Sequence, residues 1–137
     1  MTVTLDLNVL LDVFQKREPH YAASAQVVAR VTTKKITGIF PAHGLTTLYY
    51  LARRHASKPE AEKAIDRVLQ SFRLGNLDPA DWEKARRLPI EDFEDAAVAM
   101  VAQTTASEFI VTRNVEDFEG SPVLAVSPDD LMSRFLI

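Results

Sequence analysis

Residues 92–112 read DFEDAAVAMVAQTTASEFIVT, and this stretch decides the fold class. After an acidic start, every residue from 96 to 102 is apolar, and a helix that is apolar on all sides is expected to be buried. Residues 108–112 then have the composition of a short buried strand. A buried helix that leads directly into a buried strand is typical of an α/β domain.

The same alternation extends in both directions along the chain. Further strands are predicted over residues 3–7, 36–40 and 122–126, with a very short one beginning at Leu77. The spacing of apolar residues predicts helices over residues 8–16, 20–33, 43–55, 58–74, 79–88, 92–105 and 128–135. Because helices separate the strands, hairpins are excluded. We therefore expect a single α/β domain over residues 1–137, with a mainly parallel sheet covered on both faces.

The composition excludes several classes of protein. The chain has 137 residues, a net charge of -3 and 47% hydrophobic residues, values typical of a globular domain with one hydrophobic core. It contains no cysteine and its three histidines are dispersed, so thiolate metal sites and a zinc hydrolase are not expected. No secretory signal or membrane-spanning run is recognisable, and we expect a cytoplasmic protein without membrane contact.

Three acidic residues lie at strand and helix ends, where the active sites of α/β proteins form. Asp6 closes the first predicted strand, Asp95 lies in the first turn of the buried helix, and Asp117 follows the strand at 108–112. Clustered carboxylates repel one another unless a cation compensates them, and Mg²⁺ and Mn²⁺ prefer oxygen ligands. A purely structural interpretation stays open, because Asp is also typical of helix caps and turns.

Three motifs around these acids occur in a recognisable order. Residues 6–12 read DLNVLLD, residues 92–96 read DFEDA and residues 112–118 read TRNVEDF. In order and spacing these motifs resemble those of PIN domains, in particular VapC-type toxin ribonucleases of toxin-antitoxin pairs. The resemblance implies a three-layer α/β/α fold and an endoribonuclease that depends on Mg²⁺ or Mn²⁺.

The resemblance also implies roles for single residues and for partners. Asp6, Asp95 and Asp117 would be the catalytic, metal-binding acids, with Asn114 as a polar residue beside them. The implied partners are an RNA substrate, a cognate antitoxin protein and a second copy of the chain in a homodimer.

The chain departs from PIN nucleases at two positions. Thr47 stands about where the helix after the second strand usually carries an acid, and Asn114 stands where many members have a second Asp. Asp92 is the nearest replacement for the missing acid as a metal ligand, with Asp12 next. The alternative hypothesis is therefore a PIN-like protein that binds RNA or a protein partner without turnover.

An RNA substrate requires cations near the acids, because phosphate contacts supply most of the affinity. Arg113 is the best placed candidate, since its loop also carries Asp117. Asn114 and Thr47 are further candidates for substrate contacts, and Trp82 is compatible with either base stacking or packing. The paired basic residues are more typical of solvated faces; they are Lys34-Lys35, Arg53-Arg54 and Arg86-Arg87.

Overall fold

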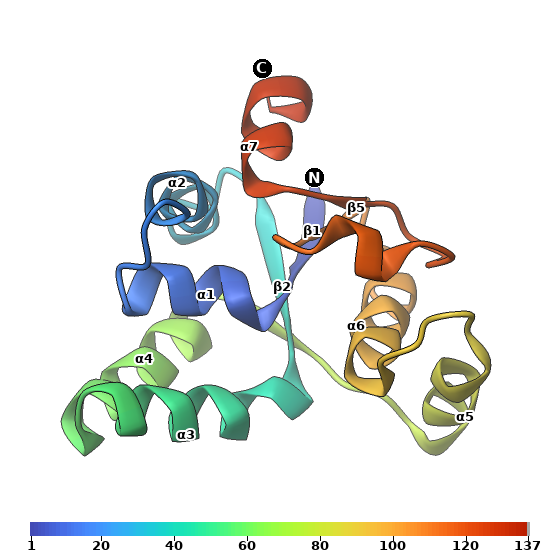
Figure 1. The fold of residues 1–137 in the computed structure, drawn as a ribbon, viewed down its shortest axis with the longest axis horizontal. Coiled ribbons are helices and arrows are strands. Elements are labelled where there is room, and N and C mark those ends of the chain that lie inside the picture. The colour runs from blue at the N-terminus through green and yellow to red at the C-terminus, as the bar shows by residue number, and fades with distance from the viewer. Residues whose placement is uncertain (137) are drawn as a thin grey trace.

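A computed structural model describes residues 1–136 of the chain. It contains a five-stranded sheet, in the order β3-β2-β1-β4-β5, in which every pair of neighbouring strands is parallel. Helices cover both faces of this sheet, with α1 to α4 on one side and α5 and α6 on the other (Figure 1). The predicted three-layer α/β/α architecture is confirmed.

The elements follow the predicted alternation. The strands are β1 (Thr2–Leu5), β2 (Thr37–Pro41), β3 (Arg73–Gly75), β4 (Phe109–Val111) and β5 (Ala125–Val126). The α-helices are α1 (Leu7–Phe14), α2 (Tyr21–Thr32), α3 (Leu45–His55), α4 (Lys58–Ser71), α5 (Pro79–Arg87), α6 (Phe93–Thr104) and α7 (Pro128–Asp130). Short turns of 3₁₀ or π-helix complete the fold: η1 (Ala42–Gly44), η2 (Val115–Phe118) and η3 (Leu131–Phe135).

The position of the third strand corrects the sequence analysis. The strand expected from Leu77 onward is wrong, because β3 lies earlier in the chain. Its first two residues, Arg73 and Leu74, fall within the range predicted for the preceding helix. That helix ends before Phe72, whose backbone is extended, and β3 then pairs with β2. At Gly75 the strand passes so close to α6 that a Cβ atom there would overlap Val101. Strand pairing and this close packing, which local periodicity does not encode, decide where the helix ends.

The ends of two other elements also differ from the prediction. The last strand is reduced to β5, two residues long, and the predicted C-terminal helix divides into α7 and the π-helical turn η3. The predicted cap of this helix is confirmed, since the hydroxyl of Ser127 accepts a hydrogen bond from the Asp130 N–H at 3.0 Å.

Side chains of the sheet alternate between two hydrophobic cores. Val3, Leu5 and Val111 point into the core beneath α1 to α4, whereas Ile110 packs against α6 on the opposite face. Helix α6 contacts both the sheet and α5, which explains why it is apolar on every side. Among residues 1–136, no helix combines the length and apolarity needed to cross a bilayer.

The parallel register determines which residues meet at the edge where the strands end. Leu5 of β1 pairs with Val111 of β4, and the backbone N–H of Asp6 donates to the Val111 carbonyl at 2.9 Å. Asp6 and Thr112 are therefore neighbours at the carboxyl edge of the sheet, although 106 positions separate them in the sequence.

Candidate functional site

Asp6 is held rigidly at this edge by donors from three residues. The Leu7 N–H donates to Oδ1 at 2.8 Å, so Asp6 is the N-cap of α1. The Thr112 hydroxyl donates to Oδ2 at 2.9 Å, and the Asn8 side-chain amide approaches the same oxygen at 3.3 Å. Burial raises the pKa of Asp6, and the hydrogen bonds from Thr112 and Leu7 oppose that rise. The Asp6 carboxyl group is thus buried, and its hydrogen bonds hold it in one orientation.

Asp95 is the most strongly perturbed acid of the site. It lies in the first turn of α6, where its N–H donates to Oδ1 of the N-cap Asp92 at 2.9 Å. Burial, followed by the negative charges of Asp6, Asp92, Asp117 and Glu94, raises the pKa of Asp95 to about 7. Carboxylates at the junction of β1 and α1, at the start of α6 and in η2 are therefore near enough to repel Asp95.

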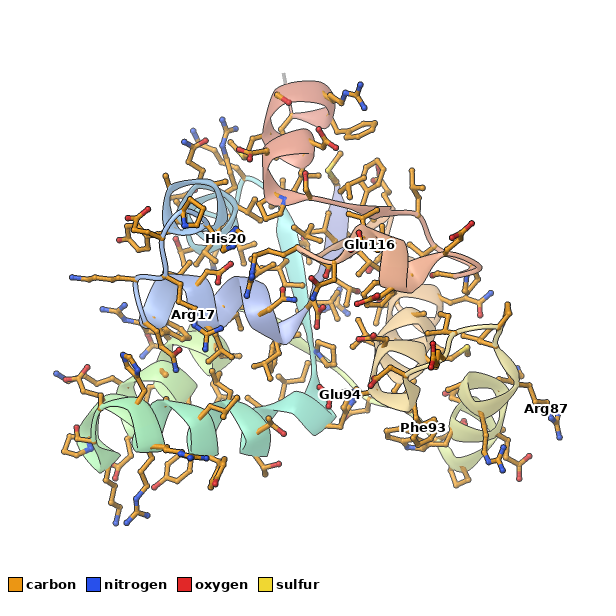
Figure 2. All side chains as sticks on the ribbon, viewed as in Figure 1. Arg17, His20, Arg87, Phe93, Glu94 and Glu116 are labelled. Atoms are coloured by element: carbon orange, nitrogen blue, oxygen red, sulfur yellow. The ribbon has the colours of Figure 1, made fainter. Side chains whose placement is uncertain are left out.

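An open pocket of about 860 Å³ lies between the start of α6 and the loop that carries η2. Its lining includes both Asp95 and Asp117, two of the three predicted catalytic acids. Among the described residues that line it, there are six acids and no Lys or Arg: Glu91, Asp92, Asp95, Glu116, Asp117 and Glu119. Figure 2 shows Glu94 at the start of α6 and Glu116 on η2. A concave surface with this charge attracts cations.

The donor chemistry of the pocket fits a hard divalent cation. Every polar side chain of the lining is a carboxylate, and Mg²⁺ is usually bound through one or two carboxylates with waters completing its octahedron. Within residues 1–136, no group of three or more His, Asp or Glu side chains is arranged to ligate one ion. The side chains thus fit an ion held by few protein ligands and several waters.

The other predicted site residues are placed differently. Nε of Arg113 lies 2.8 Å from Oδ2 of Asp12, so this arginine is ion-paired rather than free beside the pocket. The Asn114 side chain is exposed, and its backbone N–H donates to the Thr112 hydroxyl at 3.1 Å. Thr47 is half-buried in the first turn of α3 and is not part of the pocket lining.

Of the two replacement acids, Asp92 is in the pocket and Asp12 is not. Asp12 is fully buried and is held by Arg113 and by the Ser24 hydroxyl, which donates to its Oδ2 at 3.1 Å. Asp6 and Asp92 are also the N-caps of α1 and α6, so the structural interpretation of Asp at helix caps holds at both positions. Each cap uses Oδ1 of its aspartate. Oδ2 of Asp6 accepts from Thr112 and Asn8, whereas Oδ2 of Asp92 is not used by its cap.

Sequence reasoning overlooked two contributors to the site. Thr112 orients Asp6. Its signal was available, because Thr112 closes a predicted strand in a sheet expected to be parallel, as Asp6 closes the first. Glu94 acts on the pKa values of Asp6, Asp95 and His43. Burial lowers the pKa of His43, and the negative charge of Glu94 opposes this effect.

The chain belongs to the PIN domain family, since the family model for this domain matches residues 2–116. Among solved structures, VapBC2 from Rickettsia felis, bound to a DNA fragment from its promoter, has the same fold with a TM-score of 0.69. It is 18% identical, and the match covers 93% of this chain and 98% of that one. No curated protein sequence matches the chain.

Two further structures share the fold. A toxin-antitoxin complex from Klebsiella pneumoniae is 20% identical, with a TM-score of 0.68 over 92% of this chain and 97% of that one. The sarcin-ricin loop cleaving toxin VapC20 from Mycobacterium tuberculosis is 14% identical, with a TM-score of 0.64 over 79% of this chain and 86% of that one. The chain is thus a PIN domain whose fold is similar to that of VapC toxins.

Proposed function

We propose that this PIN domain is an endoribonuclease that depends on Mg²⁺ or Mn²⁺, and that Asp6, Asp95 and Asp117 are its metal-binding and catalytic acids. The observation that carries the proposal is the convergence of carboxylates from three separate segments on Asp95, whose pKa is raised to about 7. Uncompensated clustering of this kind is unfavourable in the absence of a cation and is typical of functional sites.

In such a site, some residues orient the acids and others would bind the metal ion. Thr112 and the Leu7 N–H hold the Asp6 carboxyl group in a fixed orientation, and the N-cap Asp92 fixes the first turn of α6 beneath Asp95. When bound, Mg²⁺ or Mn²⁺ would supply an activated water and neutralise charge on the phosphate oxygens. Asp92 is the proposed additional ligand, because its Oδ2 is not used by the cap.

A second candidate function is binding of RNA or protein without turnover. It is favoured by the neutral Thr47, which lies outside the pocket lining and brings no acid to it. It is also favoured by the lack of a three-ligand arrangement among residues 1–136. In that case the acidic pocket would serve as a recognition surface for basic groups.

The proposed partners follow from the same family. One similar structure is a toxin-antitoxin complex and two others are VapBC bound to DNA, which supports an antitoxin as the partner of this chain. A homodimer and a cytoplasmic location are also part of the proposal. Light scattering of the purified chain measures its oligomeric state.

The decisive experiment is incubation of a structured RNA pool with the purified protein and Mg²⁺ or Mn²⁺, with EDTA as the metal-free control. We expect cleavage that is lost in Asp95→Asn and in Asp117→Asn. The matched control is Asp66→Asn, which removes an exposed carboxylate of α4. Cleavage that persists in EDTA or in Asp95→Asn would contradict the assignment. Saturable RNA binding without cleavage would establish the second candidate.

A further inference from the structure

Three aromatic rings from distant parts of the chain meet beside the acidic pocket. The Trp82 ring of α5 lies 5.4 Å from the His43 ring of η1 and 5.7 Å from the Phe93 ring at the start of α6, measured between ring centroids. His43 and Trp82 are half-buried, whereas Phe93 is 52% exposed. The inner two rings thus support an outer ring that faces solvent.

Phe93 also borders a second hollow of about 280 Å³, which is lined by Ala85, Arg86, Ile90, Glu91, Phe93 and Ala96. Ile90 and Glu91 belong to the lining of the acidic pocket as well, so the two hollows are contiguous. Figure 2 shows Phe93 at the start of α6, on the side of α5. One end of this continuous surface carries the carboxylates, and the other carries an aromatic face and a guanidinium group.

A packing role accounts for His43 and Trp82 and for the part of Phe93 that contacts Trp82. Trp82 fills the space between α5 and the start of α6, and burial of such a ring stabilises the contact. Phe93 contacts Trp82, yet 52% of its surface remains exposed and is free to contact a ligand. Arg86 lines the hollow beside it, whereas Arg87 points outward, away from α6 (Figure 2).

We propose that Phe93, supported by Trp82 and His43, stacks against an unpaired base of single-stranded RNA, and that Arg86 binds a phosphate of the same strand. This inference rests on the proposed nuclease function, because it makes the second hollow the approach to the acidic pocket. Aromatic rings stack on any base, and the guanidinium group of an adjacent arginine donates hydrogen bonds to a backbone phosphate. The site therefore selects unpaired RNA rather than a particular base sequence.

The chain carries its own probe for this test, because Trp82 is its only tryptophan. We would titrate the Asp95→Asn protein, in Mg²⁺, with a short single-stranded oligoribonucleotide of mixed sequence while recording Trp82 fluorescence. An abasic sugar-phosphate oligomer of the same length is the comparison ligand. We expect the RNA to change the emission and to bind more tightly than the abasic oligomer.

Two variants with matched controls locate the contact. Removing the ring in Phe93→Leu, which keeps an apolar side chain, is expected to weaken RNA binding by roughly five- to a hundredfold. Phe93→Tyr should restore it, and Tyr50→Leu, at an aromatic residue that is 58% exposed on α3, should have no effect. Arg86→Gln should weaken binding and reduce its salt dependence by about one phosphate contact, while Arg87→Gln should not.

The outcomes separate this inference from the nuclease proposal. Equal affinity for RNA and the abasic oligomer, or equal effects of Phe93→Leu and Tyr50→Leu, would overturn the stacking site. Cleavage by the otherwise native Phe93→Leu protein with unchanged KM would also overturn it and leave the nuclease intact. Base-dependent binding through Phe93 by a protein that never cleaves RNA would support the stacking site and refute the nuclease.

Discussion

Nε of Arg113 lies 2.8 Å from Oδ2 of Asp12, which joins the loop after β4 to the middle of α1. The Asp12 side chain is fully buried and the Arg113 side chain is 24% exposed. The Nε–H is not directed along a hydrogen bond to that oxygen, so the contact is an ion pair, and the Ser24 hydroxyl donates to the same atom. Arg113 thus anchors the segment that presents Asp117 to the pocket.

Replacing Arg113 by Met should destabilise the fold. The substitution leaves the Asp12 carboxylate buried without its cation, and removal of one partner from a buried pair costs about 3 kcal/mol or more of unfolding free energy. Urea denaturation followed by circular dichroism measures the change. Arg87→Met, at an exposed arginine of α5, is the control, and an equal loss in both variants would refute the anchoring role.

Replacing Thr112 by Val removes the hydroxyl that donates to Oδ2 of Asp6. We expect the pKa of Asp6 to rise further, because this hydrogen bond favours the ionised carboxylate. The free energy of unfolding should fall by about 1.5 to 3 kcal/mol at pH values where Asp6 is ionised, as is usual for hydrogen bonds to charged groups. Thr112→Ser retains the hydroxyl and should recover most of this loss. A serine variant as unstable as the valine variant would indicate a packing effect instead.

The raised pKa of Asp95 predicts a pH dependence of stability. Because the pKa is about 7 in the folded protein, above the ordinary value of 3.8, the folded state binds more protons than the unfolded state between these values. The free energy of unfolding should therefore fall as the pH rises from about 4 to about 7. Thermal unfolding of Asp95→Asn, without divalent cations, should show a gain in Tm at pH 8 that disappears near pH 4. A gain that is independent of pH would contradict the assignment.

Two substitutions at Asp92 distinguish its structural and ligand roles. Asp92→Ala removes the N-cap of α6 and should cost about 1 kcal/mol of stability, whereas Asp92→Asn keeps an accepting oxygen and should cost little. If Asp92 is also a metal ligand, Asp92→Asn should reduce the increase in Tm that Mn²⁺ causes. If Mn²⁺ raises the Tm of Asp92→Asn as much as that of the native protein, Asp92 acts only as the N-cap of α6.

Removal of the divalent cation should destabilise the native chain. A ligand that binds only the folded state raises stability with its concentration relative to Kd, so Mn²⁺ should produce a saturable increase in Tm that EDTA reverses. The increase should vanish in Asp117→Asn and persist in Asp66→Asn, an exposed position on α4. If Mn²⁺ leaves the Tm of the native protein unchanged, the proposed metal site is contradicted.

Much of this fold was predictable from the sequence because its signals are local. The apolar helix at 93–104 and the strand that follows it are specified by composition alone. The position of Asp95 follows from where this helix begins, and that of Asp6 from where the first strand ends. Strand β3 escaped prediction, because three residues carry too little periodicity and only pairing with β2 distinguishes them from a helix. The last strand was predicted over residues 122–126, and β5 confirms its presence, although only Ala125 and Val126 form the strand.

The sequence by itself determined the alternation of strands and helices, and with it a parallel sheet whose carboxyl edge carries Asp6 and Thr112. Only the tertiary structure decided that Arg113 turns to Asp12, and that Trp82 lies between His43 and Phe93. The physical reason is the range of the interactions. Periodicity records which face of an element is apolar, whereas ion pairs and ring contacts between distant segments depend on how α5 and α6 dock on the finished sheet.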